Sequence, residues 1–305
     1  MNSVGIDISK GRSTVAVMRP FGEVVISPFE VCHTGSELSE LAKRLKSLDG
    51  ETRVVMEATG NYHAPVAKLL HDAGLYVSVV NAKLVHSYGN NDLRRVKTDR
   101  KDAVKLANYG LDRWLTLPRY IPEEDTRLLL KNCYRQYQQY SKVQTVLKNN
   151  LISLLDIVFP NANRLFGSPA RADGSEKWVD LIAEFWHWEC VCIRSEKAFL
   201  NKYQRWCRKH GYHFSQEKAH AIYDEASEHI GILPKSETTK LLVAQAVSQL
   251  RATSASLAAL KLEMQTLASK LPEYPAVMEM FGVGPVLGPQ LIAEIGDVPR
   301  FYSKK

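Results

Sequence analysis

The sequence predicts an α/β domain at the amino end, followed by a long helical region. Up to about residue 110, short β-branched segments bounded by Gly or Pro alternate with segments of helical spacing. From Pro122 to about Phe159 the pattern stays helical, and a second long helical pattern covers 236–270. A chain of 305 residues is long enough for two or three domains, each with its own hydrophobic core.

The amino-terminal elements begin with three predicted strands, at 4–8, 13–18 and 23–29, which we interpret as an antiparallel meander. The elements expected after it are a helix with regularly spaced leucines at 36–48, a strand at 53–56, a helix at 65–73 and a strand at 76–80. A meander followed by a βαβ unit is the order of a mixed sheet of the RNase H type.

The helical region starts with Glu123, Glu124 and Asp125, whose negative charges suit the first turn of a helix. This helix is too long for a compact globule and indicates a coiled coil or a projecting arm. Residues 160–173 interrupt it, and a Trp-rich helical segment is expected at 176–210. We therefore predict an α/β domain at 1–115, a coiled-coil insertion and assembly region at 120–270, and the start of a further helical domain at 271–305.

Composition narrows the class of protein. Forty Lys and Arg against thirty-three Asp and Glu give a formal charge of +7, which favours a polyanionic partner. No apolar run reaches the roughly 18 residues of a membrane span, so we expect a protein that neither crosses a membrane nor is exported. Five scattered cysteines lack the spacing of a disulfide framework, which favours a reducing cytoplasm.

Two acidic residues are associated with predicted strands. Asp7 lies in the first strand, on the face opposite Ile6 and Ile8, although an Asp beside a turn is the simpler explanation of this residue alone. Glu57 directly follows the strand 53–56, at the carboxyl end where open α/β sheets place their active sites.

Asp99 and Asp102 form a second pair, because residues three apart on a helix lie about 5–6 Å apart on one face. Acidic residues in a first helical turn also favour the helix dipole, which is the structural alternative. Considered together, two carboxylates on strands and two on a late helix fit a pair of divalent ions about 3.5–4 Å apart. We predict a catalytic Mg²⁺ site, with Mn²⁺ as a substitute, formed by Asp7, Glu57, Asp99 and Asp102.

Basic residues surround this acidic group and are candidates for phosphate contacts, although a solvated helix face is the default explanation. They are Lys83, Arg94, Arg95, Lys97, Arg100, Lys101 and Lys105. Gly282 and Gly284 precede a short helix in a pattern typical of a helix-hairpin-helix turn, whose backbone amides can receive a phosphate. A tight turn between two helices explains these glycines almost as well.

Three short motifs carry a family resemblance: GIDISK at 5–10, MEATGNYH at 56–63 and KTDRKDA at 97–103. In this order and spacing they resemble the DEDD transposases of the insertion-sequence one-ten type, with Piv-type DNA invertases as relatives. The resemblance implies a RuvC-like domain with an Asp-Glu-Asp-Asp metal tetrad, a coiled-coil insertion for dimer or tetramer assembly, and a carboxyl-terminal transposase domain. It also implies donor and target DNA as substrates, a structured guide RNA and a bacterial cytoplasm.

Members of this family also use a serine nucleophile, which lies beyond the glycine-rich segment. Only Ser303 follows that segment here, and it does not match the family's serine motif. We therefore expect the chain to end inside a truncated transposase domain. This leaves two hypotheses: an RNA-guided DNA transposase or recombinase, or a catalytically incomplete module for nucleic-acid binding and oligomerisation. An actin-like sugar kinase, suggested by GIDISK alone, ranks low because no second phosphate loop follows.

A few remaining residues have both a structural and a functional interpretation. Trp178, Tyr203 and Trp206 lie among basic residues and suit stacking on unpaired bases, but packing is the favoured interpretation. His63 follows Glu57 closely, and packing against the sheet is again favoured over proton transfer. Spacing of the cysteines argues against a zinc site.

Overall fold

The computed structural model describes residues 1–88, 98–229 and 231–296, and the chain divides into two compact units between Pro122 and Glu123. Arg94, Arg95 and Lys97, which are candidates for phosphate contacts, and Ser303 lie outside the described residues.

The first unit contains a five-stranded sheet in the order β3-β2-β1-β4-β5. Its strands are β1 (Asn2–Ser9), β2 (Arg12–Arg19), β3 (Glu23–Cys32), β4 (Thr52–Glu57) and β5 (Tyr76–Val80). The first three run antiparallel, whereas β4 is parallel to β1 and β5 is parallel to β4. All five predicted strands are confirmed, and their order and directions are those of an RNase H-like sheet.

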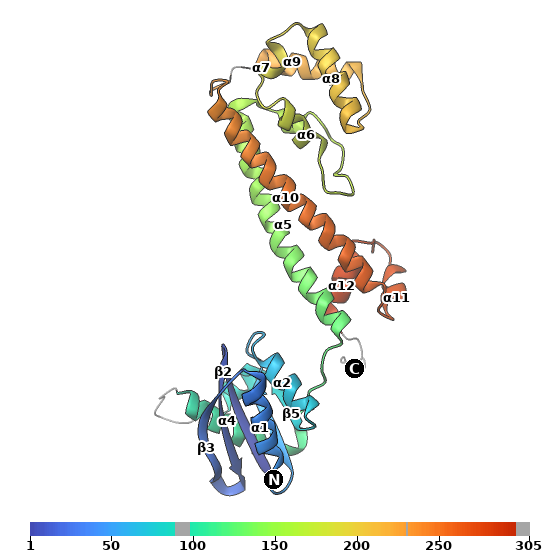
Figure 1. The fold of residues 1–305 in the computed structure, drawn as a ribbon. Helices are drawn as coiled ribbons and strands as arrows, with labels where there is room; N and C mark the ends of the chain where they lie inside the picture. Colours follow the sequence, from blue (N-terminus) through green and yellow to red (C-terminus); the bar gives the residue numbers. More distant parts are fainter. Residues whose placement is uncertain (89–97, 230, 297–305) are drawn as a thin grey trace. The chain divides into compact units, whose positions relative to one another are not determined.

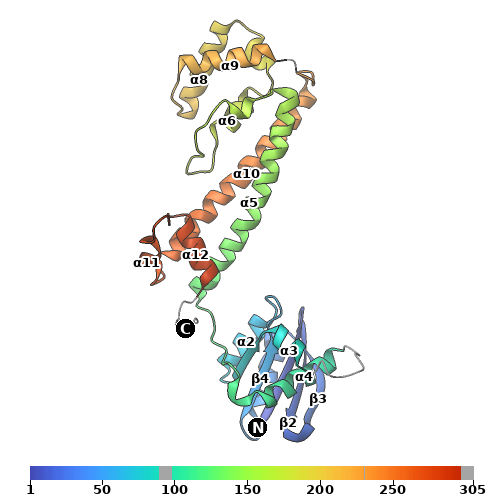
Figure 2. The ribbon, with the colours of Figure 1, turned by 180° about the vertical axis from the view of Figure 1, so that it is seen from behind.

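Helices cover both faces of this sheet (Figures 1 and 2). They are α1 (Gly35–Lys46), α2 (His63–Asp72), α3 (Ala82–Ser87) and α4 (Asp99–Asp112). The core on one face joins Val4, Ile6 and Ile8 of β1 to the leucines of α1 and to α2. The core on the other face joins Val55 of β4 to Leu106 and other residues of α4. Alternation along the strands therefore assigns every residue of β1 and β4 to one of two helical layers.

Gly5 permits the close approach of α4 to the central strand. A Cβ atom at Gly5 would lie 1.9 Å from the carbonyl oxygen of Ala103 and 2.4 Å from the amide nitrogen of Ala107. Further along α4, a Cβ at Gly110 would lie 2.3 Å from the hydroxyl of Ser3. Since higher residue numbers of α4 lie over lower numbers of β1, the helix runs opposite to the strand.

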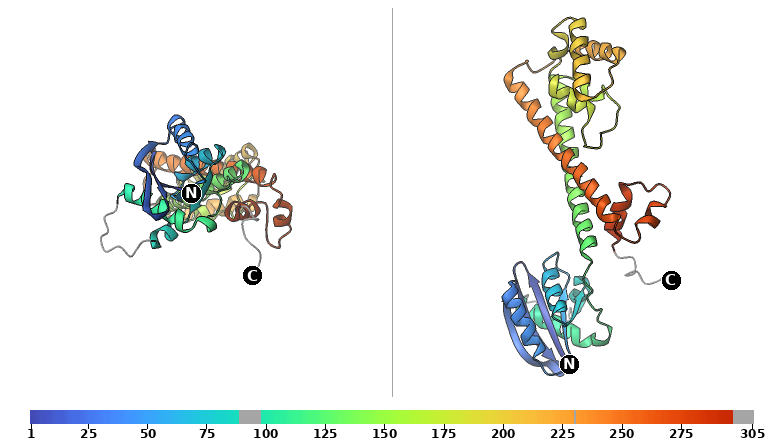
Figure 3. Two further views of the ribbon diagram at one scale, coloured as in Figure 1. Left: turned by 90° about the horizontal axis from the view of Figure 1, so that it is seen from below. Right: turned by 45° about the vertical axis from the view of Figure 1, so that its right-hand side comes forward.

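The second unit is built on two long helices, α5 (Asp125–Val158) and α10 (Glu237–Ala268), which pack against each other and cross in the right-hand view of Figure 3. Both long helices are therefore as predicted. Between them in sequence lie α6 (Lys177–Glu184), α7 (Glu189–Cys192), α8 (Glu196–His210) and α9 (Gln216–Glu228). Short 3-10 helices occur at Pro20–Gly22, Trp114–Thr116 and Ala162–Arg164.

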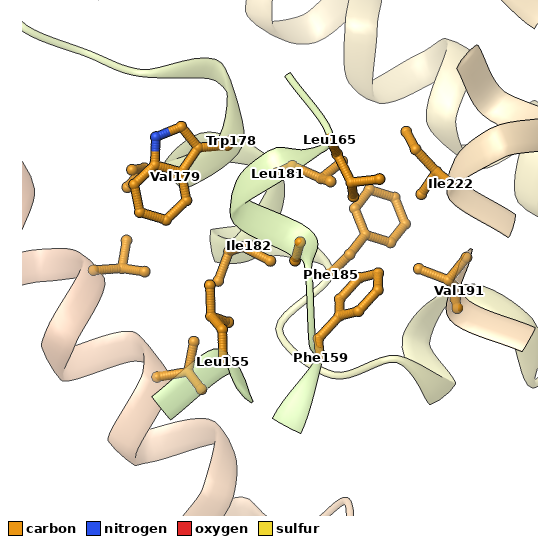
Figure 4. Packing of buried hydrophobic residues seen from close by; sticks show 14 of the residues in the cluster. Leu155, Phe159, Leu165, Trp178, Val179, Leu181, Ile182, Phe185, Val191 and Ile222 are labelled. Atoms are coloured by element: carbon orange, nitrogen blue, oxygen red, sulfur yellow. The ribbon is translucent and has the colours of Figure 1, made fainter. Parts of the chain in front are cut away.

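The segment between the long helices shares one hydrophobic core with the adjoining parts of α5 and α10, and Figure 4 shows part of this core. Phe159 from the end of α5 and Phe185 after α6 are both fully buried in this core. Trp178, Tyr203 and Trp206 are also buried there, so their packing interpretation is confirmed. Burial of several large aromatic side chains is a main source of stability for a segment of this size.

The Trp-rich segment is helical as predicted, but it consists of three helices instead of one. The break before α7 contains His187, which is fully buried. Its Nδ1 accepts a hydrogen bond from the backbone N–H of Glu189 at 3.2 Å, and its Nε2 lies 3.1 Å from the carbonyl oxygen of Leu233. A partner 46 residues away stabilises this break, which local spacing does not reveal.

Two short helices follow, α11 (Tyr274–Met278) and α12 (Leu287–Ile295). Helix α12 packs against α5 and α10, and α11 packs against α12. Ile292 and Ala293 of α12 are buried with Leu130 of α5 and Met264 of α10. These residues belong to the same compact unit as the long helices, and a separate domain from residue 271 stays a prediction. None of the described helices combines the length and hydropathy needed to cross a membrane.

Candidate functional site

Asp7 and Glu57 lie at the same end of neighbouring strands. Ile6 of β1 is paired with Met56 of β4 in a parallel register, so the next residue of each strand reaches the same edge of the sheet. Helix α4 covers the face of the sheet to which Val55 of β4 points, because a Cβ at Gly110 of α4 would lie 2.7 Å from Cγ2 of Val55. Val55 and Glu57 have the same parity on β4, so Glu57 belongs to the α4 face, as does Asp7 of β1.

Asp99 and Asp102 occupy the first turn of α4. Thr98 caps this turn by accepting a hydrogen bond from the backbone N–H of Lys101 at 3.4 Å. Because α4 runs opposite to β1 and passes Gly5 with Ala103, its first turn extends toward the carboxyl end of β1. Asp102 is half-buried and Asp99 is exposed.

The backbone thus directs the four acidic positions toward one end and one face of the sheet. Among the described residues, however, no three His, Cys, Asp or Glu side chains are arranged as a group that holds a metal ion. The structure brings the carrying elements together, and a common metal site for Asp7, Glu57, Asp99 and Asp102 stays a prediction. Their donor atoms fit Mg²⁺, since hard divalent cations prefer carboxylate oxygens supplied by several elements.

Gly5 and Gly110 are positioning residues that the sequence-based analysis did not identify. Both allow α4 to lie against β1, and Gly5 is two residues from Asp7 on the same face. A glycine inside a β-branched strand is a known sign of close backbone approach, so GIDISK carried a usable signal. His63, at the start of α2, has a buried Nδ1 with no hydrogen-bond partner among the described residues.

The described basic candidates lie on α3 and α4. Lys83, Arg100 and Lys101 are exposed near the starts of these helices. Lys105 is half-buried, and its Nζ donates to the carbonyl oxygen of His86 at 3.5 Å. Three exposed cations near the acidic positions are consistent with phosphate contacts, which stay a prediction.

The segment between α11 and α12 forms a tight turn. Gly282 has a φ of +80°, a backbone conformation that favours glycine, and neither Gly282 nor Gly284 has a neighbour close to the position of a Cβ. Within the described part of the chain, no side chain caps the start of α12. A tight turn between two helices is present, whereas a helix-hairpin-helix function and phosphate binding by Gly282 and Gly284 stay predictions.

Comparison with known proteins gives a family match over half of the chain. Residues 4–160 match the sequence profile of a DEDD family of the insertion-sequence one-ten type, described as a transposase. The pilin gene-inverting proteins of Moraxella bovis and Moraxella lacunata are each 26% identical over 140 residues, which cover 45% of this chain and 40% of each relative. The matched region of the chain thus spans about 40% of the length of these relatives.

Similar solved structures include RuvC of Thermus thermophilus, free and in complex with a Holliday junction substrate. The structure in complex is 13% identical and the free structure 14% identical, each with a TM-score of 0.30. Both matches cover 39% of this chain, and they cover 99% and 100% of the respective RuvC chains.

Proposed function

The chain belongs to the DEDD transposase family of the insertion-sequence one-ten type, and on that basis we propose that it cleaves and joins DNA during the movement of an insertion sequence. One observation carries the proposal for this chain's own residues. β1 and β4 end side by side with Asp7 and Glu57 facing α4, and the first turn of α4 carries Asp99 and Asp102 toward that end.

In this proposal the four carboxylates hold two divalent ions, Mg²⁺ or Mn²⁺. Asp7 and Glu57 contribute ligands from the rigid centre of the sheet, and Asp99 and Asp102 contribute theirs from the capped turn of α4. When bound, the ions supply an activated attacking oxygen and stabilise the leaving oxygen of a phosphodiester. Gly5 acts indirectly, because it fixes the height of α4 above β1.

The partners proposed are donor and target DNA and a structured guide RNA. Exposed Lys83, Arg100 and Lys101, and the turn at Gly282 and Gly284, are the described candidates for backbone phosphates. Binding through such contacts weakens steeply with salt, because counterions are released from the nucleic acid. We also propose a homodimer or homotetramer formed through the long helices, in a bacterial cytoplasm.

Metal binding by the purified full chain tests the tetrad directly. We expect Asp7→Asn and Glu57→Gln each to weaken Mn²⁺ binding, measured by calorimetry, by at least about tenfold, the lower end of losses seen even for residues that support metal ligands. Asp49→Asn is the matched control: it removes one exposed carboxylate at the opposite end of the same strands and should leave the affinity unchanged.

Three outcomes bear on the metal site and on the competing functions. If all three variants bind Mn²⁺ like the parent chain, the tetrad is not a metal site. If metal binding depends on Asp7 and Glu57 but the chain only binds nucleic acid and never joins DNA, the alternative of an incomplete binding and assembly module holds. DNA joining by the purified chain excludes that alternative.

A further inference from the structure

An open basic pocket of about 480 Å³ lies at the start of α6. Its walls come from the loop after Leu165, from the start of α6 and from α9 with the loop before it. The pocket is lined by the cations Arg171, Lys177 and Lys218 and by the aromatic rings of Phe166 and Tyr212. None belongs to the acidic positions or to the basic residues near them.

Three cations converge on two aromatic rings in the basic pocket. The guanidinium carbon of Arg171 lies 4.0 Å from the ring centre of Tyr212. Nζ of Lys177 lies 4.6 Å from the ring centre of Phe166 and 5.1 Å from that of Tyr212. Nζ of Lys218 lies 5.5 Å from the centre of Phe166. Contacts of this kind orient cations but do not neutralise them.

Two nearby carboxylates, those of Glu176 and Asp180, are engaged elsewhere. Glu176, next to Lys177, pairs with Lys148 at 2.6 Å and accepts from the indole of Trp178 at 2.9 Å. Asp180 pairs with Arg251 at 2.5 Å. Within the described ranges, no Asp or Glu forms an ion pair with any of the three pocket cations. Burial, with smaller contributions from Lys218 and Arg171, lowers the pKa of Lys177 from its usual 10.5. Asp173 accepts a hydrogen bond from the backbone N–H of Ser175, and the charge of Arg171 is a smaller cause of its lowered pKa. With one carboxylate beside three cations, the pocket keeps a net positive charge.

The wall of the pocket is fixed in place before any ligand arrives. The hydroxyl of Tyr212 donates to Oδ2 of Asp180 at 2.6 Å. Nη2 of Arg171 donates to the carbonyl oxygens of His210 at 2.9 Å and Gly211 at 3.3 Å. The remaining guanidinium donors of Arg171 have no protein acceptor among the described residues. A preformed wall reduces the ordering cost of binding.

We propose that the basic pocket binds a phosphate group, held by Arg171, Lys177 and Lys218. A phosphate has the size, charge and several acceptor oxygens that three converging cations require, and Arg suits it through its planar set of donors. The phosphate belongs either to a polynucleotide strand or to a small phosphorylated compound. This site is separate from the acidic positions, so its failure would not bear on the metal proposal.

Calorimetry on the full chain at low salt tests the proposal. The ligands are inorganic phosphate and short oligothymidylate with and without a 5′-phosphate. We expect the double variant Lys177→Gln, Lys218→Gln to weaken phosphate binding at least about tenfold, because two charge-assisted contacts are lost. The matched control is Lys197→Gln, Lys209→Gln, which removes two exposed lysines from α8 of the same unit. It should change the affinity less than about twofold.

Acetylation of lysines followed by mass spectrometry localises the contact. Bound phosphate should protect Lys177 and Lys218 but not Lys209. If inorganic phosphate and the 5′-phosphorylated oligonucleotide protect the lysines but the unphosphorylated oligonucleotide does not, the ligand is a terminal phosphate or a small compound. If both oligonucleotides protect them equally, the ligand is the strand backbone. The proposal is overturned if no phosphate ligand protects these lysines, or if the control variant loses as much affinity as the pocket variant.

Discussion

At the scale of single residues, Gly5 determines how close α4 lies to the sheet, and therefore the position of the first turn of α4. The backbone of Ala103 and Ala107 occupies the space that any side chain at Gly5 would fill. Backbone atoms cannot rotate away as a flexible side chain does. A methyl group at this position must therefore push the whole helix outward.

Gly5→Ala should lower the free energy of unfolding by about 1–3 kcal/mol, the usual cost of overpacking a core. Urea denaturation measures this change. Gly35→Ala is the matched control, because Gly35 starts α1 and a Cβ there meets nothing within 4 Å. The control should be neutral or slightly stabilising, since Ala favours a helix over Gly by up to about 1 kcal/mol. Equal stability of the two variants would contradict the role of Gly5.

A site residue could be predicted from the sequence where its immediate neighbours make it unusual. Asp7 and Glu57 stand out because each is a charged residue within or at the end of an apolar strand. His187 does not, because its helix-breaking role depends on the carbonyl of Leu233. The close approach at Gly5 likewise requires a helix that begins more than ninety residues later along the chain.

At the scale of elements, an ion pair ties the start of α5 to the region just before α11. The guanidinium of Arg127 holds both carboxylate oxygens of Glu273, with Nη2 to Oε2 at 3.0 Å. Both side chains are largely buried, at 10% and 16% exposure. The hydrogen bonds from Arg127 lower the pKa of Glu273 from its usual 4.5.

This ion pair makes the second unit sensitive to acid. A carboxyl whose folded pKa is depressed contributes stability above its unfolded pKa and loses it as the pH falls through the folded value. We expect a loss of about 1.5–3 kcal/mol, typical of hydrogen bonds to a charged group, as the pH falls below 4.5. Urea denaturation at several pH values measures it.

Glu273→Gln should remove most of that pH dependence, since a neutral amide does not titrate. Glu279→Gln, at an exposed position after α11, should retain the dependence of the parent chain. If Glu273→Gln still loses the same stability below pH 4.5, other carboxyls cause the effect.

Most elements could be predicted because their hydrophobic period is long or bounded by strong turn residues. The strands of the first unit and both long helices follow this rule. Helix α3 was not predicted, since six residues are too few for a period to emerge. Helix α9 was not predicted either, and its buried residues Ala219, Ile222 and Ala226 pack on a core supplied by distant elements.

At the scale of the whole molecule, the two units have separate hydrophobic cores. The first unit buries its apolar residues around the sheet, and the second around the long helices and the segment between them. A chain of residues 1–122 should therefore fold by itself and unfold cooperatively, as single domains of this size usually do. Circular dichroism with thermal unfolding tests this, and a chain without a cooperative transition would contradict it.

The proposed self-association predicts an exposed apolar surface on α5. Val143 and Val146 are 45% and 67% exposed on this helix. Val146→Lys should shift the full chain toward monomer in sedimentation experiments, because a charge cannot be buried without a partner. Gln139→Lys adds the same charge at an exposed polar position of α5 and should leave assembly unchanged. A parent chain that is already monomeric would refute the proposal.

The backbone amides of Ile232 and Leu233 both donate to the carbonyl oxygen of Ile157 at 3.2 Å, so the chain leaves α5 and returns to α10 at one point. The intervening residues form an insertion in the helical hairpin of α5 and α10. Segments whose ends meet are readily gained, lost or exchanged during evolution, since the host needs only a short joint. The basic pocket lies within this insertion, and the ion pairs Glu176–Lys148 and Asp180–Arg251 tie its wall to α5 and α10. A change in the pocket that keeps these two pairs should therefore leave the hairpin intact.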